Sequence, residues 1–210
     1  MTQAAIALDF TVDYKAQTKH VFPLAETVAV AKLLVEGDSR ADIRRKVLEE
    51  DLFELRSQSS REGALRTILR RLDNLPQAYL ELLANGNSDT RRFTLLFLVL
   101  REHRLLRELI AEVVVEKLKG LNLLVTSTDL KTFFDAKREQ EITLAQWSDS
   151  TFQKAASNAL LVLVRAGLLQ PQPAGGKRGN YEIRAVPLPA ALRQQLVLDG
   201  YEPYLALMLH

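Results

Sequence analysis

The sequence predicts a mainly α-helical protein, a helical bundle with a C-terminal subdomain that resembles a winged helix-turn-helix and contains a short β-hairpin. Three observations lead to this prediction. Apolar residues recur at helical spacing through most of the 210 residues. Capping residues, glycines and prolines divide this pattern into segments of helical length. After Gly167 the pattern changes to prolines, glycines and then alternating residues, which is typical of a hairpin.

The first three helices are each marked by a recognisable start or end. An apolar stripe at 25–34 predicts the first helix, and Gly37 ends it. Ser39 is expected to cap the second helix. Ser59 and Glu62 have the spacing of a capping box, so the third helix is expected to begin there and to run to residue 72.

The middle of the chain continues in helices. Pro76 is expected to start a short fourth helix. Residues 93–100 are nearly all apolar, which predicts a helix that is buried on all sides and forms the spine of the fold. Another helix is expected at about 105–118, and Ser127 is expected to cap one at about 129–137.

The last third of the chain changes character. Ser150 is expected to begin a helix of about sixteen residues that ends at Gly167. Residues 174–179 form a glycine-rich basic loop, and 181–186 alternate as a strand does. A final helix is expected at 190–198. This order of helix, turn, helix, strand, loop and strand is that of a winged helix-turn-helix, whose second helix enters the major groove of DNA.

The sequence thus suggests a division into three segments. They are an N-terminal helical subdomain (1–84), a central helical spine (85–126) and a winged-helix-like C-terminal subdomain (127–210).

The composition excludes several classes of protein. The absence of cysteine removes disulfides, thiolate metal sites and cysteine nucleophiles. The first ten residues lack the features of a signal peptide. The longest apolar run, 95–100, is far shorter than the roughly 20 residues that cross a bilayer. We therefore expect a cytoplasmic protein that does not associate with membranes.

The charge is weak in total but segregated along the chain. The net charge is only +2 at pH 7. Between residues 154 and 184, however, five basic residues face a single acidic one, Glu182, and a similar excess occurs between 91 and 107. Such basic stretches are compatible with a nucleic-acid partner.

No set of residues has the pattern of a catalytic or metal site. His20, His103 and His210 are scattered and lack ligand or triad partners at recognisable spacing. The loop AGGKRG lacks the spacing and the hydroxyl residue of a phosphate-binding P-loop. We therefore expect a protein that is not an enzyme and that uses no cofactor and no metal.

The helix after Ser150 and the loop that follows it form the first candidate site. Around the helix, four polar or basic residues are expected to face outward, opposite the apolar stripe, and two basic residues are expected at the tip of the wing: Lys154, Ser157, Asn158, Arg165, Lys177 and Arg178. Leu161 falls on the same outer face and weakens a purely polar surface. Because few of these side chains form bidentate base contacts, we expect binding that depends little on DNA sequence. Winged domains also dock proteins, so that alternative stays open.

A second, weaker candidate lies between Arg40 and Arg71. These residues form short helices with arginines on their exposed sides, and Arg66, Arg70 and Arg71 are the expected phosphate contacts. The alternative is a solvated helix face, on which arginines pair with acidic neighbours.

Several short motifs, taken in order, resemble those of the BrxA family of the BREX (bacteriophage exclusion) systems. The resemblance runs over nearly the whole chain and rests on Ser59-Arg61-Glu62, 68–72, 95–100, Glu116-Lys117, Asp129 with Phe133-Phe134, 147–151 and 166–169. It implies a helical core similar to the antitermination factor NusB, DNA binding and a part in host protection against phage. It implies no catalytic residue.

These observations together predict a non-enzymatic component of a BREX phage-defence system that binds duplex DNA. Other BREX proteins are expected as further partners. An RNA-binding factor of the antitermination type and a protein-docking scaffold of the defence complex remain as alternatives.

Overall fold

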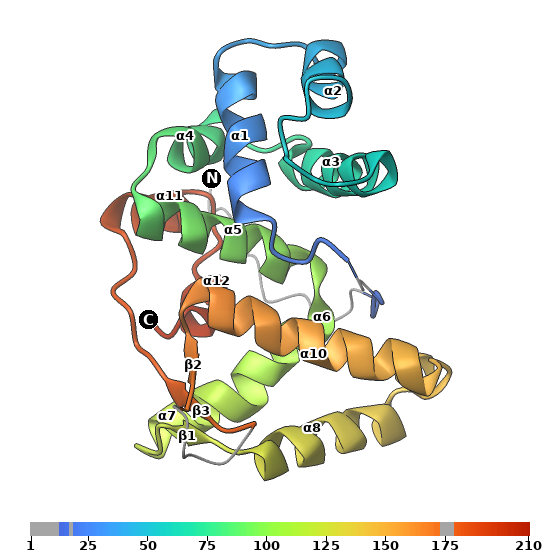
Figure 1. Ribbon diagram of the computed structural model, residues 1–210. Coiled ribbons are helices and arrows are strands. Elements are labelled where there is room, and N and C mark those ends of the chain that lie inside the picture. Colours follow the sequence, from blue (N-terminus) through green and yellow to red (C-terminus); the bar gives the residue numbers. More distant parts are fainter. Residues whose placement is uncertain (1–12, 17–18, 173–178) are drawn as a thin grey trace. The chain divides into compact units, whose positions relative to one another are not determined.

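A computed structural model describes residues 13–16, 19–172 and 179–210 (Figure 1). This part of the chain is mainly helical, with one small three-stranded antiparallel sheet, which confirms the predicted fold class. It divides into two compact units. The sheet unit contains the described residues before His20, Leu100–Pro187 and Leu196–His210. The helical unit contains His20–Val99 and Leu188–Gln195.

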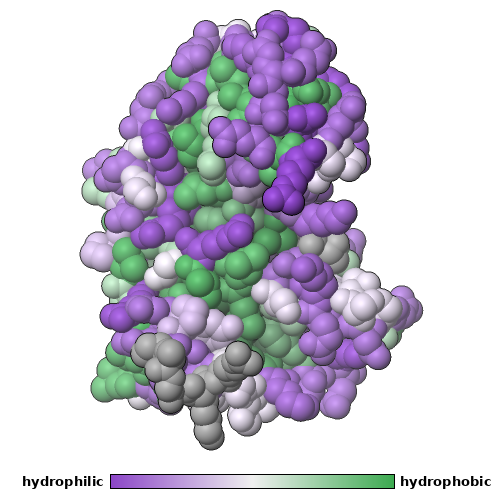
Figure 2. All heavy atoms as spheres, viewed as in Figure 1, coloured by the Kyte–Doolittle hydropathy of each residue, from purple (hydrophilic) through white to green (hydrophobic). Residues whose placement is uncertain are grey.

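The helical unit is built from the helices of the first half of the chain. They are α1 (Leu24–Val35), α2 (Arg40–Leu48), α3 (Gln58–Leu72), α4 (Gln77–Asn85) and most of α5 (Ser88–Glu102), joined by the first part of α11 (Ala190–Leu198). The helix α1 packs against α4 and α3 (Figure 1). Hydrophilic residues cover most of the surface over α2, at the top of the space-filling view (Figure 2).

The spine predicted at residues 93–100 is buried throughout. Thr94, the one polar residue within it, donates its hydroxyl hydrogen to the carbonyl oxygen of Thr90 at 2.7 Å. The ring of Phe97 stacks on that of Tyr79 with centroids 5.3 Å apart. Residues 93–100 of α5 therefore lie in the core, with no side of the helix exposed.

The cap of α3 differs from the prediction. Ser57 is the N-cap residue, and its hydroxyl oxygen accepts a hydrogen bond from the backbone N–H of Ser60 at 3.2 Å. Ser59 lies inside the first turn, and Glu62 accepts a hydrogen bond from the side chain of Gln58. The predicted capping box of Ser59 and Glu62 was therefore wrong, because the first of three nearby serines begins the helix. The cap at Ser39, by contrast, is confirmed.

From Leu100 onward, the sheet unit starts with consecutive helical segments, and it ends with short segments near the C-terminus. The predicted helix at 105–118 consists of α6 (Arg104–Leu109), a π-helical stretch η1 (Ile110–Val115) and α7 (Glu116–Lys119). Near the C-terminus, the rest of α11 is followed by α12 (Pro203–Leu207), which packs against η1.

Between these parts lie the sheet and three helices. They follow in the order β1 (Leu124–Val125), α8 (Ser127–Gln140), α9 (Ile142–Ala145), α10 (Asp149–Ala166), β2 (Leu169–Pro171) and β3 (Tyr181–Ile183). The strand order in the sheet is β1-β3-β2, and both pairs are antiparallel, with Leu124 opposite Glu182 and Leu169 opposite Ile183. The third strand of the chain thus lies in the middle of the sheet.

The two long helices of this unit have well-formed ends. Thr126 and Asp129 form the capping box of α8, and Ser148 caps α10. The predicted cap Ser127 lies inside the first turn of α8, so this prediction was wrong by one residue. The helix α10 was expected to begin at Ser150 and begins one residue earlier, at Asp149. Gly167 ends α10 with a φ of 80°, a left-handed conformation that glycine adopts without steric cost.

Some smaller elements were not predicted from the sequence. The strand β1 has two residues and α9 has four, too few for either to show a periodic pattern. The division into segments 1–84, 85–126 and 127–210 stays a prediction.

Candidate nucleic-acid interface

The exposed face of α10 carries part of the site predicted from the sequence. Lys154, Ser157 and Arg165 are exposed, and Leu161 lies between them with 37% of its surface exposed. These positions are separated by three or four residues, so they form one stripe along the helix. From Lys154 to Arg165 the stripe is about 16 Å long, given the rise of an α-helix.

Asn158 does not belong to this stripe. Only 8% of its surface is exposed, so it does not face outward as predicted. It lies on the flank of α10, one turn from Ala155 and from Val162, which are both buried. The prediction failed because neighbouring elements cover more of the helix circumference than the apolar stripe alone indicated.

The packing of α10 against α8 holds the stripe in place (Figure 1). The ring of Phe152 meets that of Phe134 edge to face, with centroids 6.2 Å apart. Arg138 of α8 lies over the ring of Phe152 and forms an ion pair with Asp149 at 2.6 Å. These contacts join the first turn of α10 to the C-terminal half of α8.

The loop between β2 and β3 was predicted to carry two contacts, Lys177 and Arg178. Both lie outside the residues that the structure describes. The described base of the hairpin is well held, since the backbone N–H of Gln172 donates to the carbonyl oxygen of Asn180 at 3.1 Å. The side-chain oxygen of the buried Asn180 accepts a hydrogen bond from the backbone N–H of Ser127 at 3.0 Å. The base of this loop is therefore attached to the start of α8.

A buried ionic cluster lies inside the sheet unit, with Glu108 at its centre. The carboxylate of Glu108, 4% exposed, accepts hydrogen bonds from the Tyr14 hydroxyl at 2.8 Å and from Arg104 at 2.7 Å. Lys137 of α8 lies 3.2 Å from the same carboxylate and 2.6 Å from that of Glu112. Three donors from separate segments thus converge on a single buried anion.

The charges of this cluster change the titration of its members. Burial, followed by the hydrogen bond to Glu108, raises the pKa of the Tyr14 hydroxyl well above its ordinary value. Burial by itself would lower the pKa of Lys137, but its bonds to Glu112 and Glu108 outweigh that effect and raise it. Both groups keep their protons at neutral pH, as their role as donors requires.

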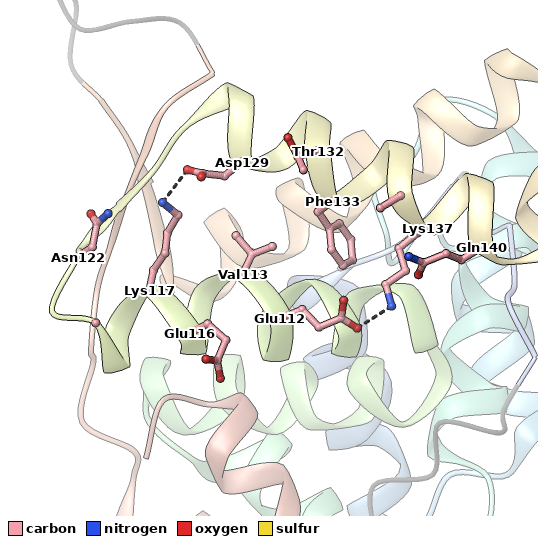
Figure 3. A pocket seen from close by; sticks show the side chains of 12 residues that line it. Glu112, Val113, Glu116, Lys117, Asn122, Asp129, Thr132, Phe133, Lys137 and Gln140 are labelled. Carbon is pink, nitrogen blue, oxygen red and sulfur yellow. Dashed lines mark hydrogen bonds and ion pairs between the residues drawn. The ribbon is translucent and has the colours of Figure 1, made fainter.

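A groove of about 630 Å³ lies between α8 and the consecutive helical segments η1 and α7 (Figure 3). Its two lysines are each paired with a carboxylate inside the protein, Lys117 with Asp129 at 2.7 Å and Lys137 with Glu112 at 2.6 Å. The third acidic residue, Glu116, leaves the lining with a negative balance. This groove is therefore a poor site for phosphate.

The second predicted set of residues lies in the helical unit. Arg66 and Arg70 of α3 are exposed, whereas Arg71 is only 4% exposed and packs into the unit. The expectation that Arg71 lies on the exposed side of its helix was therefore wrong, because the inward face of α3 includes it alongside Ile68 and Leu72. Arg66 and Arg70 line a groove between α2 and α3, which Arg40 and Arg44 of α2 line as well.

Arg40 and Arg44 were not singled out in the sequence, which showed them only as part of an arginine-rich stretch. Their spacing of four residues places them on one side of a helix. Only the packing of α2 on α3 shows that they share a groove with Arg66 and Arg70.

The described residues lack two other kinds of feature, a membrane-spanning helix and a metal-binding cluster. Among the described residues, no helix combines the length and the apolar character that crossing a bilayer demands. The same residues contain no group of three or more histidine, aspartate or glutamate side chains placed to hold a metal ion.

These features define a small helical protein with an antiparallel sheet and a helix, α10, that presents a polar and basic face. The BrxA family model matches residues 13–197, which is most of the chain. The protein therefore belongs to the BrxA family.

Two relatives called BREX protein BrxA are similar to this chain. The one from Bacillus cereus (strain H3081.97) is 27% identical over 158 residues, which cover 75% of this chain and 76% of the relative. The one from Escherichia coli O9:H4 (strain HS) is 24% identical over 143 residues, which cover 68% of this chain and 67% of the relative.

A crystal structure of an uncharacterized protein from Magnetospirillum magneticum has a similar fold. Its TM-score is 0.73 at 18% sequence identity, over 93% of this chain and 97% of that one. At this level of identity the likeness concerns the fold alone.

Proposed function

We propose that this protein is a non-enzymatic component of a bacterial BREX phage-defence system, acts in the cytoplasm and binds duplex DNA largely independently of sequence. Membership of the BrxA family supports the first part, since its relatives are called BREX protein BrxA. Other BREX proteins are the expected protein partners.

The order of elements from β1 to β3 is the main support for DNA binding. Two helices, α8 and α10, are followed by two strands that a loop connects, and β3 pairs with both β2 and β1. This is the order of a winged helix-turn-helix, in which α10 takes the place of the recognition helix and the loop that of the wing. The exposed stripe on α10 is the surface that such a helix presents to the major groove.

The residues of the stripe suit the phosphate backbone better than the base edges. Lys154 and Arg165 supply positive charge, and the hydroxyl group of Ser157 is a hydrogen-bond donor. Leu161, in the middle of the stripe, cannot form a hydrogen bond to a base. Affinity would then come mainly from phosphate neutralisation, with Lys177 and Arg178 as wing contacts, and would fall as salt rises.

A titration of fluorescent 20-base-pair duplexes of unrelated sequence tests this proposal. We expect the wild-type protein to bind them with similar affinity, and the double variant K154Q/R165Q to bind all of them more weakly. The slope of log affinity against log salt should fall by about two, one for each lost phosphate contact. Lys119→Gln, an exposed lysine outside the stripe, serves as the control.

Three results would contradict the proposal. One is binding by K154Q/R165Q that equals that of the Lys119→Gln control. Another is preference for structured RNA over a duplex DNA of equal length in direct competition, which would favour the antitermination-like alternative. The third is a protein that shifts neither nucleic acid at physiological salt, which would favour the docking scaffold.

A further inference from the structure

The groove between α2 and α3 in the helical unit combines positive charge with an open shape. It has a volume of about 470 Å³. Its lining contains four arginines, two acidic residues and two leucines, namely Arg40, Arg44, Arg66, Arg70, Glu62, Asp73, Leu65 and Leu69. The arginines outnumber the carboxylates, so the groove is positive even when every internal ion pair forms.

The arginines come in two pairs, one on each of the helices that line the groove. Arg40 and Arg44 are one helical turn apart on α2, and Arg66 and Arg70 are one turn apart on α3. Leu65, which is buried, and Leu69 directly precede Arg66 and Arg70 on α3. These two leucines add apolar surface to the lining of the groove. Two pairs of guanidinium groups beside apolar surface suit a ligand that has both charged groups and a less polar part.

The internal carboxylates hold part of this charge, though weakly. Arg40 lies 2.7 Å from Asp73, and both side chains are about half exposed or more. Arg44 lies 3.8 Å from Glu62, near the limit of an ion pair. Exposed pairs of this kind contribute little to stability, so an incoming anion can displace them at low cost. Arg66 has no ion pair within the described part of the chain.

We propose that this groove is a phosphate-binding site, separate from the face of α10. Guanidinium groups bind phosphate oxygens through paired hydrogen bonds in a fixed planar geometry, which makes arginine the preferred residue for such a ligand. The phosphate belongs either to a nucleic-acid backbone, which would extend the proposed DNA binding to the helical unit, or to a small phosphate compound.

The position of Glu62 and Asp73 has a further consequence. Each carboxylate occupies an arginine that a phosphate group would otherwise contact, so both act as internal competitors of the ligand. Removing one of these charges should therefore strengthen phosphate binding, whereas removing arginines should weaken it.

The test uses the full-length protein and two probes, a fluorescent 20-base-pair DNA duplex and inorganic pyrophosphate. The double variant R66Q/R70Q is compared with Arg56→Gln, an exposed arginine that precedes α3 and does not line the groove. We expect R66Q/R70Q to lose roughly tenfold in affinity for at least one probe and, where that probe is DNA, to reduce the salt slope by about two. Glu62→Gln should bind the same probe more tightly than the wild type.

The two probes separate the sources of the phosphate. Loss of duplex affinity assigns the groove to the nucleic-acid backbone, and loss of pyrophosphate binding alone assigns it to a small phosphate compound. The gain expected of Glu62→Gln cannot arise from misfolding. The proposal is overturned if R66Q/R70Q equals Arg56→Gln with both probes. Because K154Q/R165Q leaves the groove intact, failure of the α10 proposal can be told apart from failure of this one.

Discussion

Glu108 connects three segments of the sheet unit in its interior. It is a buried carboxylate that accepts hydrogen bonds from Tyr14 and Arg104 and pairs with Lys137. Each of these donors comes from a different segment of the chain. The carboxylate therefore joins the chain near residue 14 to α6 and α8.

Replacing Glu108 by glutamine should destabilise the protein by about 1–3 kcal/mol, because the substitution removes the buried charged acceptor that Tyr14, Arg104 and Lys137 share. Lys137 keeps its ion pair with Glu112, and Arg104 keeps one with Glu141. Urea denaturation measures this loss. Glu116→Gln is the control, since its side chain is 59% exposed and pairs with the exposed Lys119. Equal unfolding midpoints for the two variants would show that the cluster contributes no more than surface pairs do.

Asn158 and Ser157 are neighbours with opposite expected roles. Asn158 is buried and Ser157 is exposed. A buried polar side chain forms hydrogen bonds whose loss costs about 1–3 kcal/mol. Asn158→Ala should therefore lower the thermal midpoint, whereas Ser157→Ala should leave it unchanged and affect DNA affinity alone. A stable Asn158→Ala protein with weakened DNA binding would restore Asn158 to the interface.

At the scale of elements, the start of α8 gives stability that depends on pH. Burial of Asp129 would raise its pKa, but the bonds from Lys117 and Thr126 prevail and lower it below the ordinary value. The charged carboxylate is therefore favoured by the folded state. This contribution is complete above the pKa of the unfolded chain, about 4, and is lost as pH falls below it.

The variant Asp129→Asn should thus be less stable than the wild type by about 1 kcal/mol at pH 7, the usual weight of a helix cap. The difference should shrink as the pH falls below about 4, the pKa of the unfolded chain, and through the lower pKa of the folded carboxylate. Urea denaturation at several pH values measures it. A difference that stays constant over this range would mean that the charge of Asp129 has no part in the cap.

The elements also show which sequence signals were informative. The helix α1, which has an apolar stripe, lies where it was expected, α5 includes the apolar run at 93–100, and α11 has the predicted bounds. The caps of α3 and α8 were misplaced by two residues and one residue, and the start of α10 by one, because several nearby Ser and Thr side chains satisfy the same spacing rule. In such a run, the residue that becomes the N-cap is the one whose own backbone is extended, as at Ser57 and Thr126.

At the scale of the whole molecule, the net charge of +2 is too small to attract DNA over long distances. Binding must then depend on local surfaces, the stripe on α10 and the groove between α2 and α3. The first lies in the sheet unit and the second in the helical unit.

If both surfaces bind the same duplex independently, the losses caused by K154Q/R165Q and R66Q/R70Q should add in the logarithm of affinity. A fourfold variant compared with the two double variants in the duplex titration measures this. A combined loss much smaller than the sum would show that the two surfaces do not contribute separately to one complex.

The sequence alone determined the fold class, the positions of most helices and the identity of the exposed stripe residues Lys154, Ser157 and Arg165. These features depend on local spacing, which is visible along the chain. The tertiary structure alone decided that Asn158 and Arg71 are buried and that β1 pairs with β3. It also decided that Arg40 and Arg44 share a groove with Arg66 and Arg70. The reason is that burial and strand pairing depend on which distant segments pack against an element. The residue pattern within one element does not specify those segments.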